Sequence, residues 1–249
     1  MRYFISLAYK GTNFHGWQLQ PNAVSVQEKI NDGLSMLLKE PVMVLGAGRT
    51  DTGVHAKEMY AHFDSDKEFD CEKIAYRLNS YIDDAILIKS IFSVSETTHA
   101  RFHAIARTYE YWICQEKNPF LKEGAWLMYS NLDFDLMNAA AAYLLEIEDF
   151  TSFAKIHSDV KTHICDVRKA TWERRDDKWV FTIEADRFLR NMVRAIVGTL
   201  VDVGKGKISV QEFKDVITKK DRGSAGGSAP AQGLYLVKVE YPQELLNGN

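Results

Sequence analysis

Gly46-Ala47-Gly48-Arg49-Thr50-Asp51-Thr52-Gly53-Val54-His55-Ala56 separates two apolar runs and carries one carboxylate at its centre. Glycine reaches backbone conformations with positive φ that other residues resist, so the three glycines favour a tight loop that presents Asp51. Arg49 and His55 lie close to this carboxylate in the sequence. The stretch therefore predicts a functional loop between two strands, and a plain turn is the alternative.

Two common phosphate-binding motifs do not fit this loop. The dinucleotide fingerprint needs a glycine three residues after Gly48, where Asp51 stands. The P-loop needs a lysine after its second glycine, but Val54 follows Gly53. A carboxylate inside a phosphate cradle would also repel the ligand. Asp51 is therefore predicted to be a catalytic or structural carboxylate and not part of a nucleotide site.

The residues on both sides of the loop predict an α+β fold. Residues 3–9 alternate in a strand pattern, and a capping box of Ser25 and Glu28 begins a helix that ends at Pro41. The other expected elements of this half are strands over 42–45 and 59–63, a helix over 71–79 and a strand over 86–94. This order resembles a ferredoxin-like unit.

The second half repeats the order loosely. Its expected elements are a strand over 107–114, a helix over 135–145, strands over 168–172 and 179–185, a long helix over 188–203 and a last strand over 234–241. We therefore expect two α+β domains, 1–104 with the Asp51 loop and 105–249. Residues 222–230 resemble a flexible linker by composition, although their backbone amides could equally serve function.

The composition is that of an ordinary globular protein. The chain has 249 residues, of which 46% are hydrophobic and 26% charged, so it can bury a substantial core. No apolar run approaches the roughly 18 residues of a membrane span, and no signal-type segment opens the chain, so we expect no membrane partner and a cytoplasmic location. The widely spaced Cys71, Cys114 and Cys165 favour reduced structural thiols.

Two segments mix residues that suit RNA. Because the net charge is −3, an RNA site has to be a local basic patch. Residues 99–111 interleave basic and aromatic side chains, and the arginines beside His99 and His103 disfavour a metal ion there. On the expected helix 188–203, three arginines follow one polar edge in i, i+3, i+7 register, namely Arg187, Arg190 and Arg194. A solvated basic face is the alternative.

Several motifs, in their order along the chain, resemble the TruA branch of the pseudouridine synthases. They are Tyr9-Lys10-Gly11-Thr12-Asn13-Phe14-His15-Gly16-Trp17-Gln18, the Gly48–Ala56 loop, His99-Ala100-Arg101-Phe102, Arg107-Thr108-Tyr109-Glu110-Tyr111, Phe188-Leu189-Arg190-Asn191-Met192-Val193-Arg194 and Ser228–Leu236. The resemblance implies an isomerase that converts uridine to pseudouridine in the anticodon stem-loop of tRNA, at tRNA positions 38, 39 and 40. It also implies the pseudouridine synthase fold, in which two ferredoxin-like or RRM-like halves form a mixed, mostly antiparallel central sheet with helices packed on it.

The resemblance further implies the roles of individual residues. The reaction moves the ribose C1′ bond of uracil from N1 to C5, so it needs a nucleophile or cation stabiliser near C1′ and no redox or energy cofactor. Asp51 matches that group, Arg194 its guanidinium partner, and Tyr109 the tyrosine that stacks on the base and relays a proton. The implied substrate-binding residues are Arg49, Tyr109, Leu234, His55 and Arg101. No metal is expected.

The resemblance also implies how the tRNA is held. The target uridine must be flipped out of its helix, at a cost of a few kcal/mol. A homodimer that grips one tRNA across both subunits is expected. Among the alternatives, a nucleoside hydrolase would use Asp51 with Glu58 and release uracil. A non-catalytic tRNA-binding protein would not need Asp51, and a synthase for another RNA would use the same residues. One departure is Arg190, which stands where many relatives carry histidine.

Overall fold

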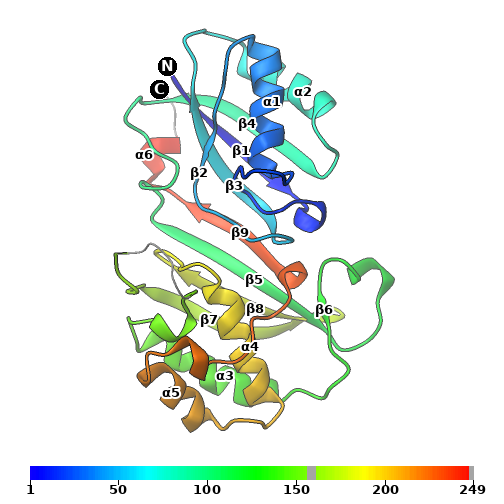
Figure 1. Cartoon of the computed structure of the whole chain (residues 1–249), viewed down its shortest axis with the longest axis vertical. Coiled ribbons are helices and arrows are strands. Elements are labelled where there is room, and N and C mark those ends of the chain that lie inside the picture. The colour runs from blue at the N-terminus through cyan, green and yellow to red at the C-terminus, as the bar shows by residue number, and fades with distance from the viewer. Residues whose placement is uncertain (156–160, 247–249) are drawn as a thin grey trace. The chain divides into compact units, whose positions relative to one another are not determined.

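The computed structural model describes residues 1–155 and 161–246, which divide into two compact units (Figure 1). The first unit consists of Met1–Ile105 and Tyr235–Asn249, and the second of Ala106–Leu234. The expected second domain includes residues 235–246, whereas the structure groups them with the first unit. The chain therefore returns to its N-terminal half at its end.

The first unit is a sheet with helices packed on it. Its elements are β1 (Arg2–Tyr9), α1 (Val26–Leu38), β2 (Leu45–Gly46), β3 (His55–Asp64), α2 (Cys71–Tyr81), β4 (Ile86–Val94), β9 (Leu234–Glu240) and α6 (Gln243–Leu246). The strand order is β4-β1-β3-β9, and β2 pairs with β3. Among the described residues of this unit, β3 and β9 pair in parallel and the other pairings are antiparallel. The expected ferredoxin-like order of strands and helices is thus present.

Residue alternation and capping explain the first two elements of this unit. Ile5 and Leu7 are fully buried on β1 and stand opposite Ala61 and Met59 of β3. At the start of α1 the predicted capping box is confirmed, because the Ser25 hydroxyl accepts from the Glu28 amide and the Glu28 carboxylate accepts from the Ser25 amide. The helix ends at Leu38, before the expected Pro41, because Lys39 adopts the left-handed conformation.

The second unit has the same α+β character. Its main elements are β5 (Ala106–Cys114), β6 (Trp126–Leu127), α3 (Phe134–Ala142), β7 (Val167–Arg175), β8 (Lys178–Ala185), α4 (Met192–Gly204) and α5 (Val210–Thr218). The antiparallel order is β5-β8-β7, and β6 lies parallel to β5. Figure 1 shows α3, α4 and α5 gathered on these strands. The predicted α+β class with mixed, mostly antiparallel pairing and packed helices is therefore confirmed.

Two predicted elements are wrong in their bounds. Residues 41–44 form no strand, because side chains of α1 bind their backbone: Asn31 Oδ1 accepts from the Val44 amide at 2.9 Å and Gln27 Nε2 donates to the Val44 carbonyl at 2.7 Å. The long helix begins at Met192 and not at residue 188, because Asn191 adopts a left-handed conformation with φ 66°. Arg187 and Arg190 therefore precede α4, and the expected register of three arginines on one helix is wrong.

Membrane insertion of a helix finds no support in this fold. Within residues 1–155 and 161–246, no helix has the length and apolar character to cross a bilayer.

Candidate active site

Asp51 lies in the loop between β2 and β3, where its side chain is half-buried. Its backbone carbonyl accepts from the Val54 amide at 3.1 Å, which closes a tight turn. Of the three glycines expected to supply positive φ, only Gly53 does so, with φ 78°. Gly46 is required for another reason, since a Cβ there would lie 2.6 Å from the ring of Trp17. The loop is thus shaped by both conformation and packing.

Residues 9–17 hold the Asp51 loop from one side. The Tyr9 hydroxyl is 2.9 Å from Oγ1 of the buried Thr50, and the Trp17 amide donates to the Thr50 carbonyl at 3.2 Å. The Gly53 amide donates to the Phe14 carbonyl at 3.3 Å. These bonds fix the residues on both sides of Asp51, so the carboxylate is carried on a rigid support.

Two glycines let these segments approach so closely. A Cβ on Gly11 would lie 2.0 Å from the Val54 carbonyl oxygen, and a Cβ on Gly16 would lie 2.4 Å from the Thr50 carbonyl oxygen. Gly16 also has φ 88°, which side chains disfavour. The glycines of the Tyr9–Gln18 motif are therefore required by contact with the Asp51 loop.

His55, a predicted substrate-binding residue, is only 2% exposed. Its Nδ1 accepts from the Gly11 amide at 3.0 Å, so that nitrogen carries no proton. Its ring stacks on Tyr235 of β9 with centroids 4.6 Å apart. This environment suits a residue that positions the Asp51 loop, whereas contact with RNA needs an accessible edge.

Arg49 is exposed, and its guanidinium is oriented through Gln18 by Gln27 of α1. Its Nε donates to Gln18 Oε1 at 3.1 Å, and Gln18 Nε2 donates to Oε1 of the buried Gln27 at 3.0 Å. A guanidinium held in this way is oriented before RNA arrives.

Arg101, the other predicted RNA contact of this unit, is exposed next to an exposed aromatic ring. Its guanidinium carbon lies 5.8 Å from the centroid of the Phe102 ring, which is 73% exposed. His99 Nδ1 accepts from the Arg101 amide at 3.1 Å and fixes this turn. A cation beside an exposed ring is a surface suited to a phosphate and an unstacked base.

Tyr109, Arg194 and Leu234 belong to the second unit. Tyr109 is half-buried on β5, and its ring meets Phe188 edge to face with centroids 5.1 Å apart. Leu234, 6% exposed, is the first residue of β9. No sequence pattern indicated the contact between Tyr109 and Phe188.

Arg194 lies in the first turn of α4 and is half-buried. Its Nε donates to the Ala229 carbonyl at 2.8 Å, and the Ala229 amide donates to the Arg194 carbonyl at 2.9 Å. The next carbonyl, that of Pro230, accepts from the hydroxyl of the fully buried Tyr111 at 2.8 Å. Burial raises the pKa of Tyr111, so this hydroxyl stays a donor. Tyr111 and Ala229 are contacts that the sequence did not reveal.

Asp51, Arg49, His55 and Arg101 thus lie in the first unit, and the other predicted site residues in the second. The grouping of Asp51 with Arg194 and Tyr109 stays a prediction. A metal site has no support in the described ranges, where no group of three or more metal-binding side chains occurs.

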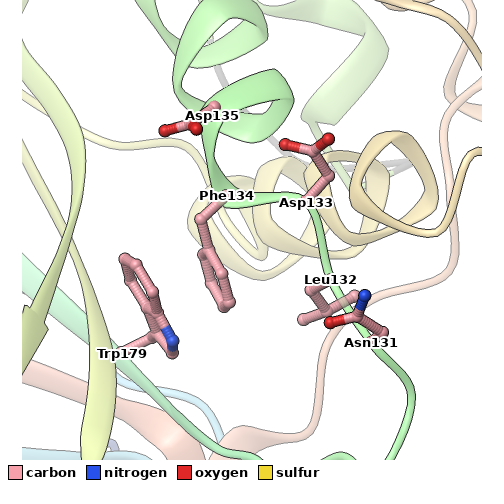
Figure 2. A pocket seen from close by; sticks show the side chains of 6 residues that line it. All are labelled: Asn131, Leu132, Asp133, Phe134, Asp135 and Trp179. Carbon is pink, nitrogen blue, oxygen red and sulfur yellow. The ribbon is translucent and has the colours of Figure 1, made fainter.

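A hollow in the second unit lies among residues that the sequence did not single out (Figure 2). It is lined by Asn131, Leu132, Asp133, Phe134, Asp135 and Trp179. Figure 2 shows the rings of Phe134 and Trp179 side by side, and they stack at 3.7 Å. Asp133 caps α3 by accepting from the Leu136 amide. These contacts serve the fold, and we assign the hollow no role in catalysis.

Known proteins resemble the chain along almost its whole length. A family model described as tRNA pseudouridine synthase matches residues 140–242. A tRNA pseudouridine synthase A of Bacteroides thetaiotaomicron is 52% identical over 99% of this chain and 93% of its own length. The protein of the same name from Bacteroides fragilis is 52% identical over 98% of both chains. One from a Thermoanaerobacter species is 41% identical over 95% of this chain and 98% of its own.

Proposed function

The chain belongs to the tRNA pseudouridine synthase family and isomerises uridine in tRNA, and we propose that it acts in the anticodon stem-loop with Asp51 as the reacting carboxylate. The proposed targets are positions 38, 39 and 40. As the N1–C1′ bond breaks, the carboxylate either adds to ribose C1′ or assists loss of the 2′ proton to give a glycal. Uracil then rotates and rejoins C1′ through C5, and the C5 proton leaves. Uridine and pseudouridine have the same composition, since the proton lost from C5 is balanced by the proton gained at N1, so the reaction needs no redox or energy cofactor.

The observation that carries this proposal is the contrast between Asp51 and its neighbours. Thr50 is buried and bonded to Tyr9, Gly53 is bonded to Phe14, and the side chain between them is half-exposed. A reacting group must be reachable by substrate and yet held in place, because misplacement by about 1 Å can cost about 100-fold in rate. A residue that only capped a turn would not need support from a second segment.

We propose the remaining roles from the resemblance to the family, and chemistry supports them. Arg194 supplies the guanidinium partner of the Asp51 carboxylate. Tyr109 stacks on the flipped uracil and carries a proton between C5 and solvent. Leu234 forms the apolar wall of the uracil site. Arg49 enters the place that the flipped nucleotide leaves, and Arg101 binds phosphate. We propose that His55 acts through the loop and does not touch RNA.

We further propose that the protein works in the cytoplasm as a homodimer. A tRNA held across two subunits meets basic residues from both, which reconciles RNA binding with a net charge of −3. The molar mass in solution tests this: twice the 28.4 kDa of one chain is expected. A mass equal to one chain, with full activity at the same concentration, would exclude the dimer as the working form.

The activity is tested by mapping pseudouridine at base resolution in tRNA transcripts treated with wild type or Asp51→Asn. Product in the anticodon stem-loop from wild type and none from the variant is expected, because the amide cannot act as the anionic nucleophile. Equal rates would remove Asp51 from the mechanism. Product elsewhere would exclude the proposed target, and free uracil would indicate a hydrolase.

A further inference from the structure

Residues 222–230 resemble a flexible linker by composition, but residues 226–229 are bound to α4 and to its N-cap, Asn191, so of the two alternatives the solvated spacer is wrong. The segment begins with a 3-10 turn, Arg222–Ser224, that Asp221 caps by accepting from the Gly223 amide at 3.1 Å. It ends at Ala229 and Pro230, whose carbonyls accept from Arg194 and Tyr111. Glycine content therefore reflects close packing here.

The middle of the segment lies directly on the backbone of α4. A Cβ on Gly198 would be 1.7 Å from the Gly227 carbonyl oxygen, so no side chain fits between the two. The Gly226 amide donates to Thr199 Oγ1 at 3.0 Å, and that hydroxyl donates to the Ala195 carbonyl at 2.8 Å. The segment and the helix therefore form one rigid piece around the turn that carries Arg194.

Arg222 holds this segment in its shape from within. Its Nη1 donates to the Gly226 carbonyl at 3.1 Å, and its Nη2 donates to Ser228 Oγ at 3.1 Å. The same Ser228 hydroxyl accepts from Asn191 Nδ2 at 2.7 Å, at the N-terminus of α4. One guanidinium thus ties the glycine turn to the residue immediately before Ala229.

Ala229 passes this restraint to Arg194. A guanidinium is planar, so a bond to Nε fixes the plane and the direction in which the two terminal NH2 groups point. If the Ala229 carbonyl moves, the fork of Arg194 turns with it. The direction of the charge, and not only its presence, depends on the 222–230 segment.

We propose that Arg222 is a positioning residue for the isomerase, which acts by holding Ala229 where it orients the Arg194 guanidinium. This rests on the role proposed above for Arg194 beside Asp51. Arg222 itself does not touch the substrate. Its loss therefore lowers the rate of the chemical step and leaves tRNA affinity unchanged.

The test compares Arg222→Ala and Arg222→Lys with wild type in single-turnover rate and in tRNA affinity at fixed salt. Arg222→Ala is expected to lower the rate by about 10-fold or more, because catalysis is sensitive to sub-ångström placement, with Kd unchanged within about 2-fold. Arg222→Lys keeps the charge but loses the two-ended contact, so an intermediate loss is expected. Lys219→Ala, which removes an exposed charge close in sequence, serves as the control and should match wild type.

A double mutant decides whether Arg222 acts through Arg194. In an Arg194→Lys background, Arg222→Ala should cost little further rate, since the group that it orients is gone. Full additivity of the two losses, or a wild-type rate for Arg222→Ala, would overturn the proposal. A wild-type rate for Arg194→Lys alone would instead overturn the role of Arg194. Melting temperatures are measured for every variant, and if Arg222→Ala does not fold, Arg222→Lys and Ser228→Ala carry the same comparison.

Discussion

Buried imidazoles in this protein act as acceptors of backbone hydrogen bonds. Nδ1 of His62 accepts from the Ala100 amide at 3.2 Å, as Nδ1 of His55 does from Gly11. Both rings are 2% exposed. A ring that accepts at Nδ1 must be neutral, so protonation breaks a bond that holds a loop. For His62, this bond therefore links the geometry of the loop at Ala100 to pH.

The first prediction concerns His62 and stability. Burial, with neighbouring His99 and Arg2, lowers the pKa of His62 from 6.5 to about 4. Between these pH values the unfolded chain binds the proton and the folded one does not. The free energy of unfolding therefore has the whole contribution of His62 above pH 6.5 and decreases as the pH falls toward 4. We expect this group to account for about 3 kcal/mol of the loss. Urea unfolding at a series of pH values measures it.

His62→Gln is the control for this effect, because glutamine keeps an acceptor and does not titrate. Its unfolding free energy should depend less steeply on pH than that of wild type across the same window. Asp64 faces His62 and titrates at lower pH, since its hydrogen bond with Arg2 lowers its pKa. Parallel pH profiles for the two proteins would show that His62 does not contribute.

The second prediction concerns Gly11. Alanine there would bring a Cβ to 2.0 Å from the Val54 carbonyl oxygen, and backbone atoms cannot yield as a flexible side chain can. Gly11→Ala should therefore lower the free energy of unfolding by about 1–3 kcal/mol and reduce turnover through displacement of the Asp51 loop. Gly48→Ala, where a Cβ meets nothing within 4 Å, is the matched control for stability. Equal stability of the two variants would contradict this account of the Tyr9–Gln18 motif.

At the scale of elements, the sequence predicts strands and helices well where periodicity is local. The capping box of Ser25 and Glu28 placed the start of α1, since both partners lie within one turn. The strand predicted over 42–45 is wrong for residues 42–44, because side chains of Asn31 and Gln27 bind the backbone of Val44 and periodicity does not reveal such bonds. The start of α4 failed because one left-handed residue, Asn191, outweighed an apolar pattern that continued before it.

The third prediction separates helix propensity from packing in α4. Alanine is the better helix former, so Gly198→Ala should stabilise an isolated helix by about 1 kcal/mol. Here the new Cβ would be 1.7 Å from the Gly227 carbonyl oxygen, so we expect a net loss of unfolding free energy instead. Thermal unfolding measures the sign. Gly227→Ala, whose Cβ meets nothing within 4 Å, should have a stability close to that of wild type. A Gly198→Ala variant more stable than wild type would show that the Gly227 carbonyl moves to make room for the Cβ.

At the scale of the whole molecule, the sequence revealed the family and not the contacts that support its site. Six motifs in a fixed order indicated the family and its reaction, because each motif is a contiguous stretch of sequence that can be recognised without the structure. The supports join distant segments, as Arg194 does with Ala229 and His55 with Tyr235. No local pattern links such pairs. The same holds for the grouping of residues 235–246 with the first unit.

The last prediction concerns the charge of the molecule as a whole. A net charge of −3 disfavours tRNA at long range, so binding must come from arginines such as Arg101 that neutralise individual phosphates. The logarithm of the dissociation constant for tRNA should therefore rise linearly with the logarithm of salt concentration. Arg101→Ala should weaken binding and lower that slope by about one. Phe102→Ala, which removes the adjacent exposed ring and no charge, should weaken binding and leave the slope unchanged. Filter binding over a salt series measures the dissociation constant and the slope. Each released counterion contributes to the slope independently of the affinity. A slope that Arg101→Ala does not alter would therefore show that another residue makes the phosphate contact.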